Sequence, residues 1–136
     1  MRKLMYLIMA VLLFMGCSKN RRGQNGDDQI TLQVQQVKEK NAEDLAFRIR
    51  VFAHLPADFK DRKQLNEKME YGIDSCFFRL NRGKQELPSG VIPVANGIKD
   101  CFEYVLLFSG SVADKNEQLV YRDKYISGKT YQVILK

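Results

Sequence analysis

The chain has 136 residues, of which 45% are apolar and 28% are charged, and its formal charge is +6 at pH 7. This composition excludes collagen-like, low-complexity and wholly disordered chains, and the length fits one small domain. The charge does not indicate nucleic-acid binding, because the part of the chain after residue 26 is nearly neutral. It contains 17 of the 22 basic residues and all 16 acidic ones. The other five lie near the N-terminus and are Arg2, Lys3, Lys19, Arg21 and Arg22.

The first 16 residues have the anatomy of a secretory signal peptide. Two basic residues precede an uninterrupted apolar run over residues 4–15, and Gly16 ends the segment. The run is shorter than the stretch of about 20 apolar residues that a membrane-spanning helix needs. We therefore expect residues 1–16 to be a signal peptide that directs the chain out of the cytoplasm.

A bacterial lipobox is the motif that the end of this segment resembles. The stretch is Leu13-Phe14-Met15-Gly16-Cys17, a relaxed form in which Phe14 and Met15 replace the usual branched and small residues. The resemblance implies that the Cys17 thiol accepts diacylglycerol and anchors the chain, since two or three acyl chains hold a protein stably at a membrane. The alternative is an ordinary signal peptide with an unrelated cysteine near its cleavage site.

The residues after Cys17 suggest the membrane to which the protein is sorted and a linker to its domain. Ser18 stands where an Asp resembles an inner-membrane retention signal, so the resemblance implies an outer-membrane lipoprotein, with its domain facing the periplasm. Residues 17–26 are polar and contain glycine, which predicts a flexible tether. Fully extended, such a tether would reach about 35 Å and let a domain formed by residues 27–136 hang clear of the bilayer.

Alternation of apolar and polar residues dominates the chain from Ile30 onward and predicts strands. In residues 45–53 it places Leu45, Phe47, Ile49 and Val51 on the core face, opposite Arg48 and Arg50. In residues 75–80, Cys76, Phe78 and Leu80 alternate with Ser75, Phe77 and Arg79. The predicted strands are 30–35, 45–53, 75–80, 101–109, 119–121 and 131–135.

Short strands separated by turn residues indicate an all-β fold, an antiparallel β-sandwich of about six or seven strands. A turn is expected at Ser127, Gly128 and Lys129, before the last strand. Residues 58–70 are thinly apolar and predict one short inserted surface helix, with a loop as the alternative. The strand–helix–strand rhythm of a Rossmann-like sheet is missing from the sequence.

Cys76 and Cys101 would lie in an oxidising compartment, where they could form a disulfide. A bond across the intervening 24 residues would contribute roughly 3.5 kcal/mol in the chain-entropy model. A turn near residues 88–89 would bring the two cysteines opposite each other, whereas a turn at residues 81–83 would break that register. The disulfide and two separate buried thiols therefore both stay open.

The sequence does not predict an enzyme, a metal site or a cofactor. His54 is the one histidine, stands at the end of a predicted strand, and has no ligand or nucleophile spacing around it. The carboxylates 43–44, 58, 61, 67 and 70 fall in polar segments, where acid catalysis is not favoured. Glu103 lies among apolar residues, and we expect it to pair with a cross-strand Arg or Lys.

Two features suggest a protein interface. Residues 88–97 form an apolar predicted loop, in which Val91, Ile92 and Val94 would either pack on the sheet or contact a partner. Tyr121 and Tyr125, beside the last turn, could be exposed. A sugar-binding aromatic platform is the weaker interpretation, because the chain has no Trp.

These features favour a non-catalytic interaction module. In size and layout the chain looks like the small outer-membrane lipoproteins of secretion-system membrane complexes, including type VI machines, although no motif of the domain carries that likeness. The resemblance implies a membrane anchor through the N-terminal lipid, envelope proteins as partners, and no nucleic acid. The alternatives are a cell-surface glycan- or ligand-binding lipoprotein and an envelope inhibitor or immunity lipoprotein with a protruding loop at residues 84–97.

Overall fold

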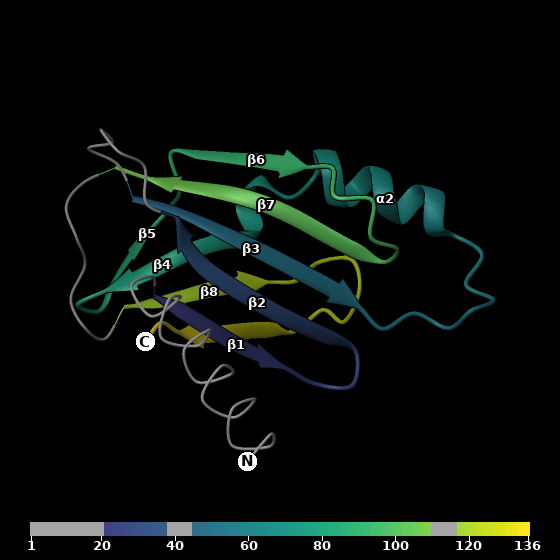
Figure 1. Cartoon of the computed structure of the whole chain (residues 1–136), viewed down its shortest axis with the longest axis horizontal. Helices are drawn as coiled ribbons and strands as arrows, with labels where there is room; N and C mark the ends of the chain where they lie inside the picture. The colour runs from purple at the N-terminus through teal and green to yellow at the C-terminus, as the bar shows by residue number, and fades with distance from the viewer. Residues whose placement is uncertain (1–20, 38–44, 110–116) are drawn as a thin grey trace, which may run out of the picture.

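Two antiparallel sheets form a β-sandwich in the parts of the chain that the computed structural model describes, residues 21–37, 45–109 and 117–136 (Figure 1). The five-stranded sheet has the order β1-β2-β3-β7-β6, and the four-stranded sheet has the order β5-β4-β8-β9. The all-β sandwich is thus confirmed, with nine strands in these residues rather than six or seven. Their bounds are β1 Arg22–Gly26, β2 Ile30–Val37, β3 Leu45–Ala53, β4 Phe77–Asn81, β5 Lys84–Glu86, β6 Gly90–Val94, β7 Cys101–Phe108, β8 Gln118–Arg122 and β9 Thr130–Ile134.

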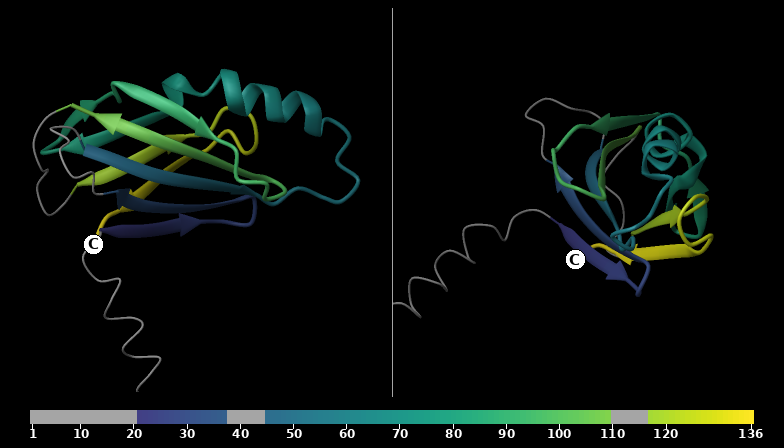
Figure 2. Two further views of the ribbon diagram at one scale, coloured as in Figure 1. Left: turned by 45° about the horizontal axis from the view of Figure 1, so that its top comes forward. Right: turned by 90° about the vertical axis from the view of Figure 1, so that its right-hand side faces the viewer.

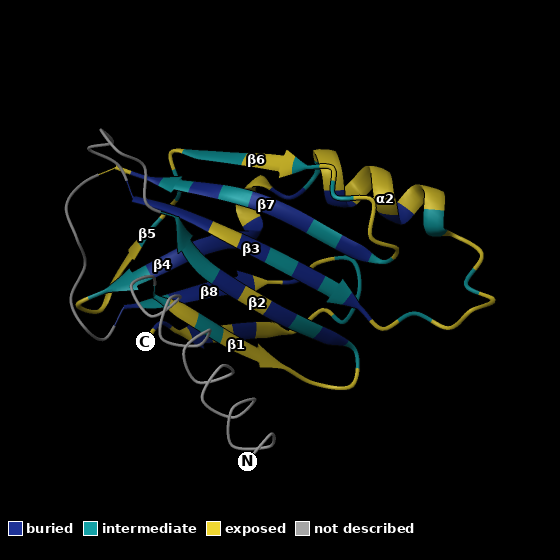
Figure 3. Cartoon of the chain, viewed as in Figure 1, coloured by how far each residue is buried: buried dark blue, intermediate teal, exposed yellow. Residues whose placement is uncertain are grey.

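The segments with the clearest alternation lie in the five-stranded sheet. In β3, Phe47, Ile49 and Val51 are buried, and Arg48 and Arg50 lie on the opposite face, as predicted. Figure 3 shows this alternation as bands of buried and less buried residues along β2 and β3. The core between the sheets includes Ile30, Leu32, Phe47, Phe77, Tyr104, Leu106, Phe108, Leu119, Tyr121 and Val133.

The strand β1 overturns part of the predicted tether. Its first residue is bonded to the end of the chain, since Arg22 N–H donates to the Lys136 carbonyl at 3.1 Å and Lys136 N–H donates back at 3.0 Å. Glycine here permits close packing and not flexibility, because a Cβ on Gly23 would lie 2.5 Å from Val133 Cγ1. The tether prediction is therefore wrong for residues 22–26, and the folded domain begins before residue 27.

In β4 the side chains that face the core are Phe77 and Arg79. The Phe77 ring stacks on Tyr121 with a centroid distance of 5.1 Å. Phe78 points to the other side of the sheet, where the Arg122 guanidinium lies 5.2 Å from its ring centroid. The inward set is thus the more polar of the two alternating sets, and it brings a charged side chain into the sandwich.

Two edge strands lie in the segment 84–97, which was predicted to contain an apolar loop at residues 88–97 and, in the inhibitor alternative, to protrude. A tight turn at Arg82 and Gly83, with φ of 52° and 78°, folds β5 back on β4. β6 then pairs with β7, so the segment passes from the edge of one sheet to the edge of the other. The apolar residues 90–94 are an edge strand, and the prediction of a loop is wrong for them.

Helix α2 (Arg62–Tyr71) packs along the side of the sandwich away from β1 (Figure 2). It was predicted over residues 58–70 as a surface helix, and most of its residues are exposed. Leu65 and Met69 are buried, and the Tyr104 hydroxyl donates to the Met69 carbonyl at 2.5 Å. A 3-10 turn, η1 (Asp74–Cys76), leads from α2 into β4. Among the described residues no helix has the length and apolarity to cross a membrane.

Candidate functional site

The outward side of β1, β2 and β3 carries a polar hollow of about 510 Å³. We call its polar lining the arginine face. Strand pairing sets these side chains in two rows across the three strands, with Arg22 beside Gln35 and then Arg48, and Gln24 beside Gln33 and then Arg50. The rows arise because alternate residues of each strand point away from the core. The arginine face consists of Arg22, Gln24, Gln33, Gln35, Arg48 and Arg50.

Among the described residues, one carboxylate pairs with the arginine face. Glu103, on β7, is the strand partner of Arg50 and accepts a hydrogen bond from Arg50 Nε at 2.5 Å. Arg48 Nε lies 3.9 Å from the other oxygen of Glu103, Oε2, and the Arg48 side chain is 46% exposed. This confirms the expected cross-strand pairing of Glu103, and the hydrogen bond raises the pKa of Arg50. Three guanidinium groups against one carboxylate leave the arginine face positive.

A second hollow, of about 520 Å³, lies between α2 and the connection from β6 to β7. We call it the helix-side hollow, and its apolar lining includes Met69, Val94, Ile98 and Phe102. Ile98 is 44% exposed at its rim. Arg62 joins α2 to the connection between β6 and β7, because its Nε and Nη2 each lie 3.2 Å from a carboxylate oxygen of Asp100.

The predicted interface residues separate into different environments. Val94 lines the helix-side hollow, Ile92 is 49% exposed on β6, and Val91 packs against the core. Tyr121, considered as a possible exposed interface residue beside the last turn, is buried, so that possibility is wrong for it. Its ring stacks on the rings of Phe77 and Tyr131, and burial raises the pKa of its hydroxyl. Tyr125 is half-buried, and its hydroxyl donates to the Gly72 carbonyl at 2.7 Å.

Cys76 and Cys101 are free buried thiols, so the disulfide that the sequence left open is not formed. Cys76 ends η1 ahead of the four-stranded sheet, and Cys101 begins β7 in the other sheet. The turn at residues 81–83 is what separates them, because β4 pairs with β5 and not with β7. Burial raises the pKa of both thiols, which keeps them protonated at neutral pH.

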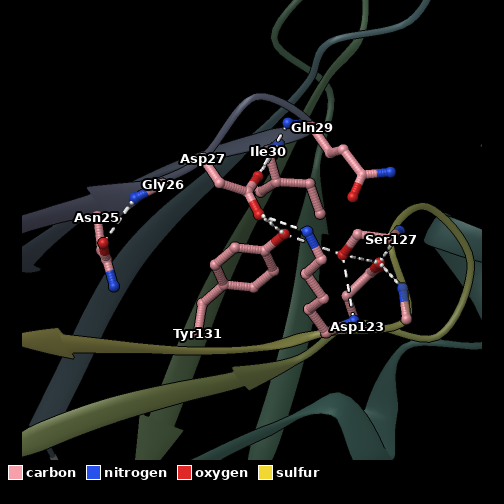
Figure 4. Close-up of polar contacts among 10 residues, drawn as sticks. Asn25, Gly26, Asp27, Gln29, Ile30, Asp123, Ser127 and Tyr131 are labelled. Carbon is pink, nitrogen blue, oxygen red and sulfur yellow. Dashed lines mark hydrogen bonds and ion pairs between the residues drawn. The ribbon is translucent and has the colours of Figure 1, made fainter.

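A cluster around Asp123 and Ser127 has the residue types of a catalytic site, but its hydrogen bonds hold a turn together (Figure 4). The buried Asp123 carboxylate accepts hydrogen bonds from the Tyr121 hydroxyl at 2.9 Å and from the N–H groups of Ser127 and Gly128. Burial by itself raises the pKa of Asp123, but these hydrogen bonds outweigh it and lower the pKa. The cluster therefore explains the predicted turn rather than a reaction.

Asp27 joins this turn to the turn between β1 and β2. Its Oδ1 accepts hydrogen bonds from the N–H groups of Gln29 and Ile30, both at 2.9 Å. The Tyr131 hydroxyl lies 3.0 Å from Asp27 Oδ2 and 2.9 Å from Ser127 Oγ (Figure 4). Hydrogen bonds from the two backbone N–H groups are the main reason that the pKa of Asp27 is lowered.

A buried ion cluster that the sequence did not reveal lies between the sheets near the start of β1. Arg79 Nη1 donates to Glu117 Oε1 at 3.1 Å, and its Nε donates to Glu86 at 2.5 Å. Arg21 Nη1 donates to the other oxygen of Glu117 at 3.2 Å. The one available signal was a charged residue within the apolar segment 76–80, which indicates either an outward position or a buried partner.

The other candidate residues show no reactive arrangement in the described parts of the chain. His54 Nε2 lies 2.7 Å from Thr31 Oγ1 beyond the end of β3. Asp58, Asp61, Glu67 and Glu70 are exposed. Within the described ranges, no group of three or more His, Cys, Asp or Glu side chains could hold a metal ion. Cys17, Glu43 and Asp44 lie outside those ranges.

Comparison of the chain with protein families, with curated proteins and with solved structures found no match.

Proposed function

We propose that this protein is a non-catalytic outer-membrane lipoprotein, whose periplasmic domain attaches a protein assembly of the envelope, such as a secretion-system membrane complex, to the membrane. The observation that carries the proposal is the lipobox-like stretch that ends at Cys17, only four positions ahead of Arg21. Arg21 already belongs to the fold through its ion pair with Glu117. A lipid on Cys17 would therefore hold the sandwich directly at the bilayer.

A binding role rather than a catalytic one is supported by the hydrogen bonds and ion pairs of the buried carboxylates. The carboxylates of Asp27 and Asp123 bind backbone N–H groups of their own turns. Glu117 neutralises two guanidinium groups. In these clusters the carboxylates are engaged in holding the fold, so they are poorly placed to serve as acids or bases toward a substrate.

The protein partner in this proposal binds at the helix-side hollow. The hollow combines apolar side chains, with Ile98 exposed at its rim, with polar ones such as Asn66 and Lys99, and protein interfaces commonly have such an apolar centre with a polar surround. It is lined by residues of α2, and α2 lies on the side of the sandwich away from β1 (Figure 1). A domain held through its β1 side would present α2 and this hollow to a subunit that approaches from the periplasm.

The anchor is tested with Cys17→Ser. We expect the wild-type protein to fractionate with the outer membrane and to carry an acyl mass on an N-terminal Cys17, as read by mass spectrometry. The variant should move to the soluble periplasmic fraction with an unchanged far-ultraviolet circular dichroism spectrum. A mature N-terminus at another residue, or a protein without acyl mass, would contradict the proposal.

The partner surface is tested with a matched pair of substitutions. Ile98 at the hollow and Ile134 on β9 are exposed to similar extents, 44% and 54%. We expect Ile98→Asp to abolish co-purification of an envelope-complex subunit from detergent extracts, and Ile134→Asp to leave it unchanged. A monomer that captures no envelope subunit, or equal capture by the two variants, would refute this role. Retention of the wild type on a peptidoglycan or polysaccharide resin instead would favour the ligand-binding alternative.

A further inference from the structure

The structured part of the domain comes so near to Cys17 that it cannot hang clear of a membrane. Three residues, Ser18, Lys19 and Asn20, separate Cys17 from Arg21. Arg21 is fixed, because its side chain pairs with Glu117 at 3.2 Å and its carbonyl accepts the Gln36 N–H at 2.8 Å. Four residue steps of extended chain span at most about 14 Å, so a lipidated Cys17 holds Arg21 within that distance.

The entry point of the chain lies at a seam between the two sheets. Arg22 exchanges two backbone hydrogen bonds with Lys136, and the Asn25 side chain donates to the Gln132 carbonyl of β9 at 2.8 Å. From this seam the arginine face extends on one side, over β1, β2 and β3. The outward side of β8 and β9 extends on the other. A tether this short keeps both of these surfaces close to the membrane, so either of them is near enough to lie against it.

Charge distinguishes the two surfaces. Within the part of the chain that the structure describes, the arginine face carries Arg22, Arg48 and Arg50 against the carboxylate of Glu103. On the outward side of β8 and β9, strand pairing aligns Arg122 with Thr130, Val120 with Gln132, and Gln118 with Ile134, so the paired residues carry one cation. Two exposed lysines follow these strands, Lys136 at the seam itself, where it is bonded to Arg22, and Lys124 at the opposite end of β8, far from the entry point of the chain. A surface of anionic lipids attracts the more basic of two equally near surfaces, with a range of about one Debye length, 8 Å.

The two rows of the arginine face also suit phosphate chemistry. Neighbouring strands are about 4.8 Å apart, so the Cα atoms of Arg22 and Arg48 lie about 10 Å apart, with Gln35 on the strand between them. Guanidinium groups donate two parallel hydrogen bonds to a phosphate, and the glutamine amides add further donors. The lining is polar, which fits headgroups and not the hydrocarbon core of a bilayer.

We propose that the arginine face docks on anionic phospholipid headgroups of the membrane that holds Cys17, and so fixes the orientation of the domain. This inference rests on the lipid anchor of the proposed function. It gives the sandwich two opposed roles, with β1, β2 and β3 on the membrane and α2 with its hollow turned toward the periplasm. The lipid on Cys17 and the arginine face would then together set the orientation of the domain as well as hold it at the membrane.

The test uses the mature lipidated protein reconstituted in phosphatidylcholine vesicles, with or without phosphatidylglycerol. A single reporter thiol is introduced by Gln33→Cys in the arginine face or by Asn66→Cys on the exposed side of α2, and its rate of alkylation by a water-soluble maleimide is measured. Both native thiols of the domain are buried. We expect phosphatidylglycerol to slow alkylation at position 33 about tenfold, high salt to restore it, and the rate at position 66 to stay unchanged.

Charge reversal supplies the matched control. In the Gln33→Cys protein, Arg22→Glu with Arg48→Glu should abolish the protection by phosphatidylglycerol, whereas Lys60→Glu with Lys63→Glu, the same change of charge next to and on α2, should preserve it. Equal rates in the two kinds of vesicle, protection at position 66 instead, or protection that survives the reversal at Arg22 and Arg48 would overturn the docking. A preparation without acyl mass overturns the anchor itself, so the two failures are read separately.

Discussion

Substitution of Glu117 by glutamine removes the charge at the centre of the buried ion cluster with little change of volume. Glu117 is 1% exposed and accepts hydrogen bonds from Arg79 at 3.1 Å and from Arg21 at 3.2 Å. The variant therefore leaves two guanidinium groups without their shared carboxylate. Arg79 is itself 2% exposed, with its guanidinium carbon 5.1 Å from the centroid of the Phe108 ring, so water cannot replace the lost partner.

The expected loss of stability is about 3 kcal/mol. Removal of one partner from a buried ion pair costs about 3–5 kcal/mol, because the other charge stays buried. The low end applies here, since Arg79 keeps its 2.5 Å contact with Glu86 and the Arg21 side chain is 24% exposed. For a domain of this size, about 4 °C of melting temperature corresponds to each kcal/mol, so the melting temperature should fall by about 12 °C.

Thermal and urea unfolding of the Cys17→Ser protein without its signal peptide, followed by circular dichroism, measures this loss. Glu67→Gln on the exposed side of α2 is the control, and we expect it to change stability by less than about 0.5 kcal/mol. Replacement of the pair by Arg79→Met with Glu117→Leu should recover much of the stability, because the two charges that lose a partner, Arg21 and Glu86, are 24% and 37% exposed and can be hydrated. A loss in Glu117→Gln as small as that of the control would refute the assignment of a buried, stabilising cluster.

Three other predictions follow from the fold. Gly23→Ala should lower the urea midpoint by the equivalent of about 1–3 kcal/mol, because its Cβ would meet Val133 Cγ1 at 2.5 Å; an unchanged midpoint would mean that β1 does not pack on β9. Asp123 has a folded-state pKa below the unfolded value of about 3.9, so its ionised form stabilises the fold above that pH, and the stability is lost as the pH falls through the folded pKa. Asp123→Asn should cost about 2 kcal/mol at pH 7 and flatten the acid limb of the stability curve, and a limb equal to that of the wild type would contradict this. Alkylation without reductant should add no label to Cys76 and Cys101 in the folded protein and two labels after denaturation, whereas no label after denaturation would reveal a disulfide.

Local alternation was sufficient for much of the sandwich. A strand with one buried face imposes period two on its side chains, and residues 47–51 display that period. The turn at residues 127–129 was also predictable, since Gly128 adopts φ of 71°. Glu103 was expected to pair with a cross-strand cation for a local reason, because a charge in an apolar strand needs a partner.

Tertiary contacts decided the rest, and β1 is the clearest case. Residues 22–26 are as polar and glycine-containing as a linker, but β2 and the chain end supply their backbone partners, and those partners are far away in sequence. Tyr121 is buried because Phe77 and Tyr131 cover its ring from other strands. The sequence by itself thus determined that the chain forms strands and which residues of β2 and β3 face inward. Where the domain begins, and therefore how near its arginine face lies to Cys17, was decided by pairing between distant segments.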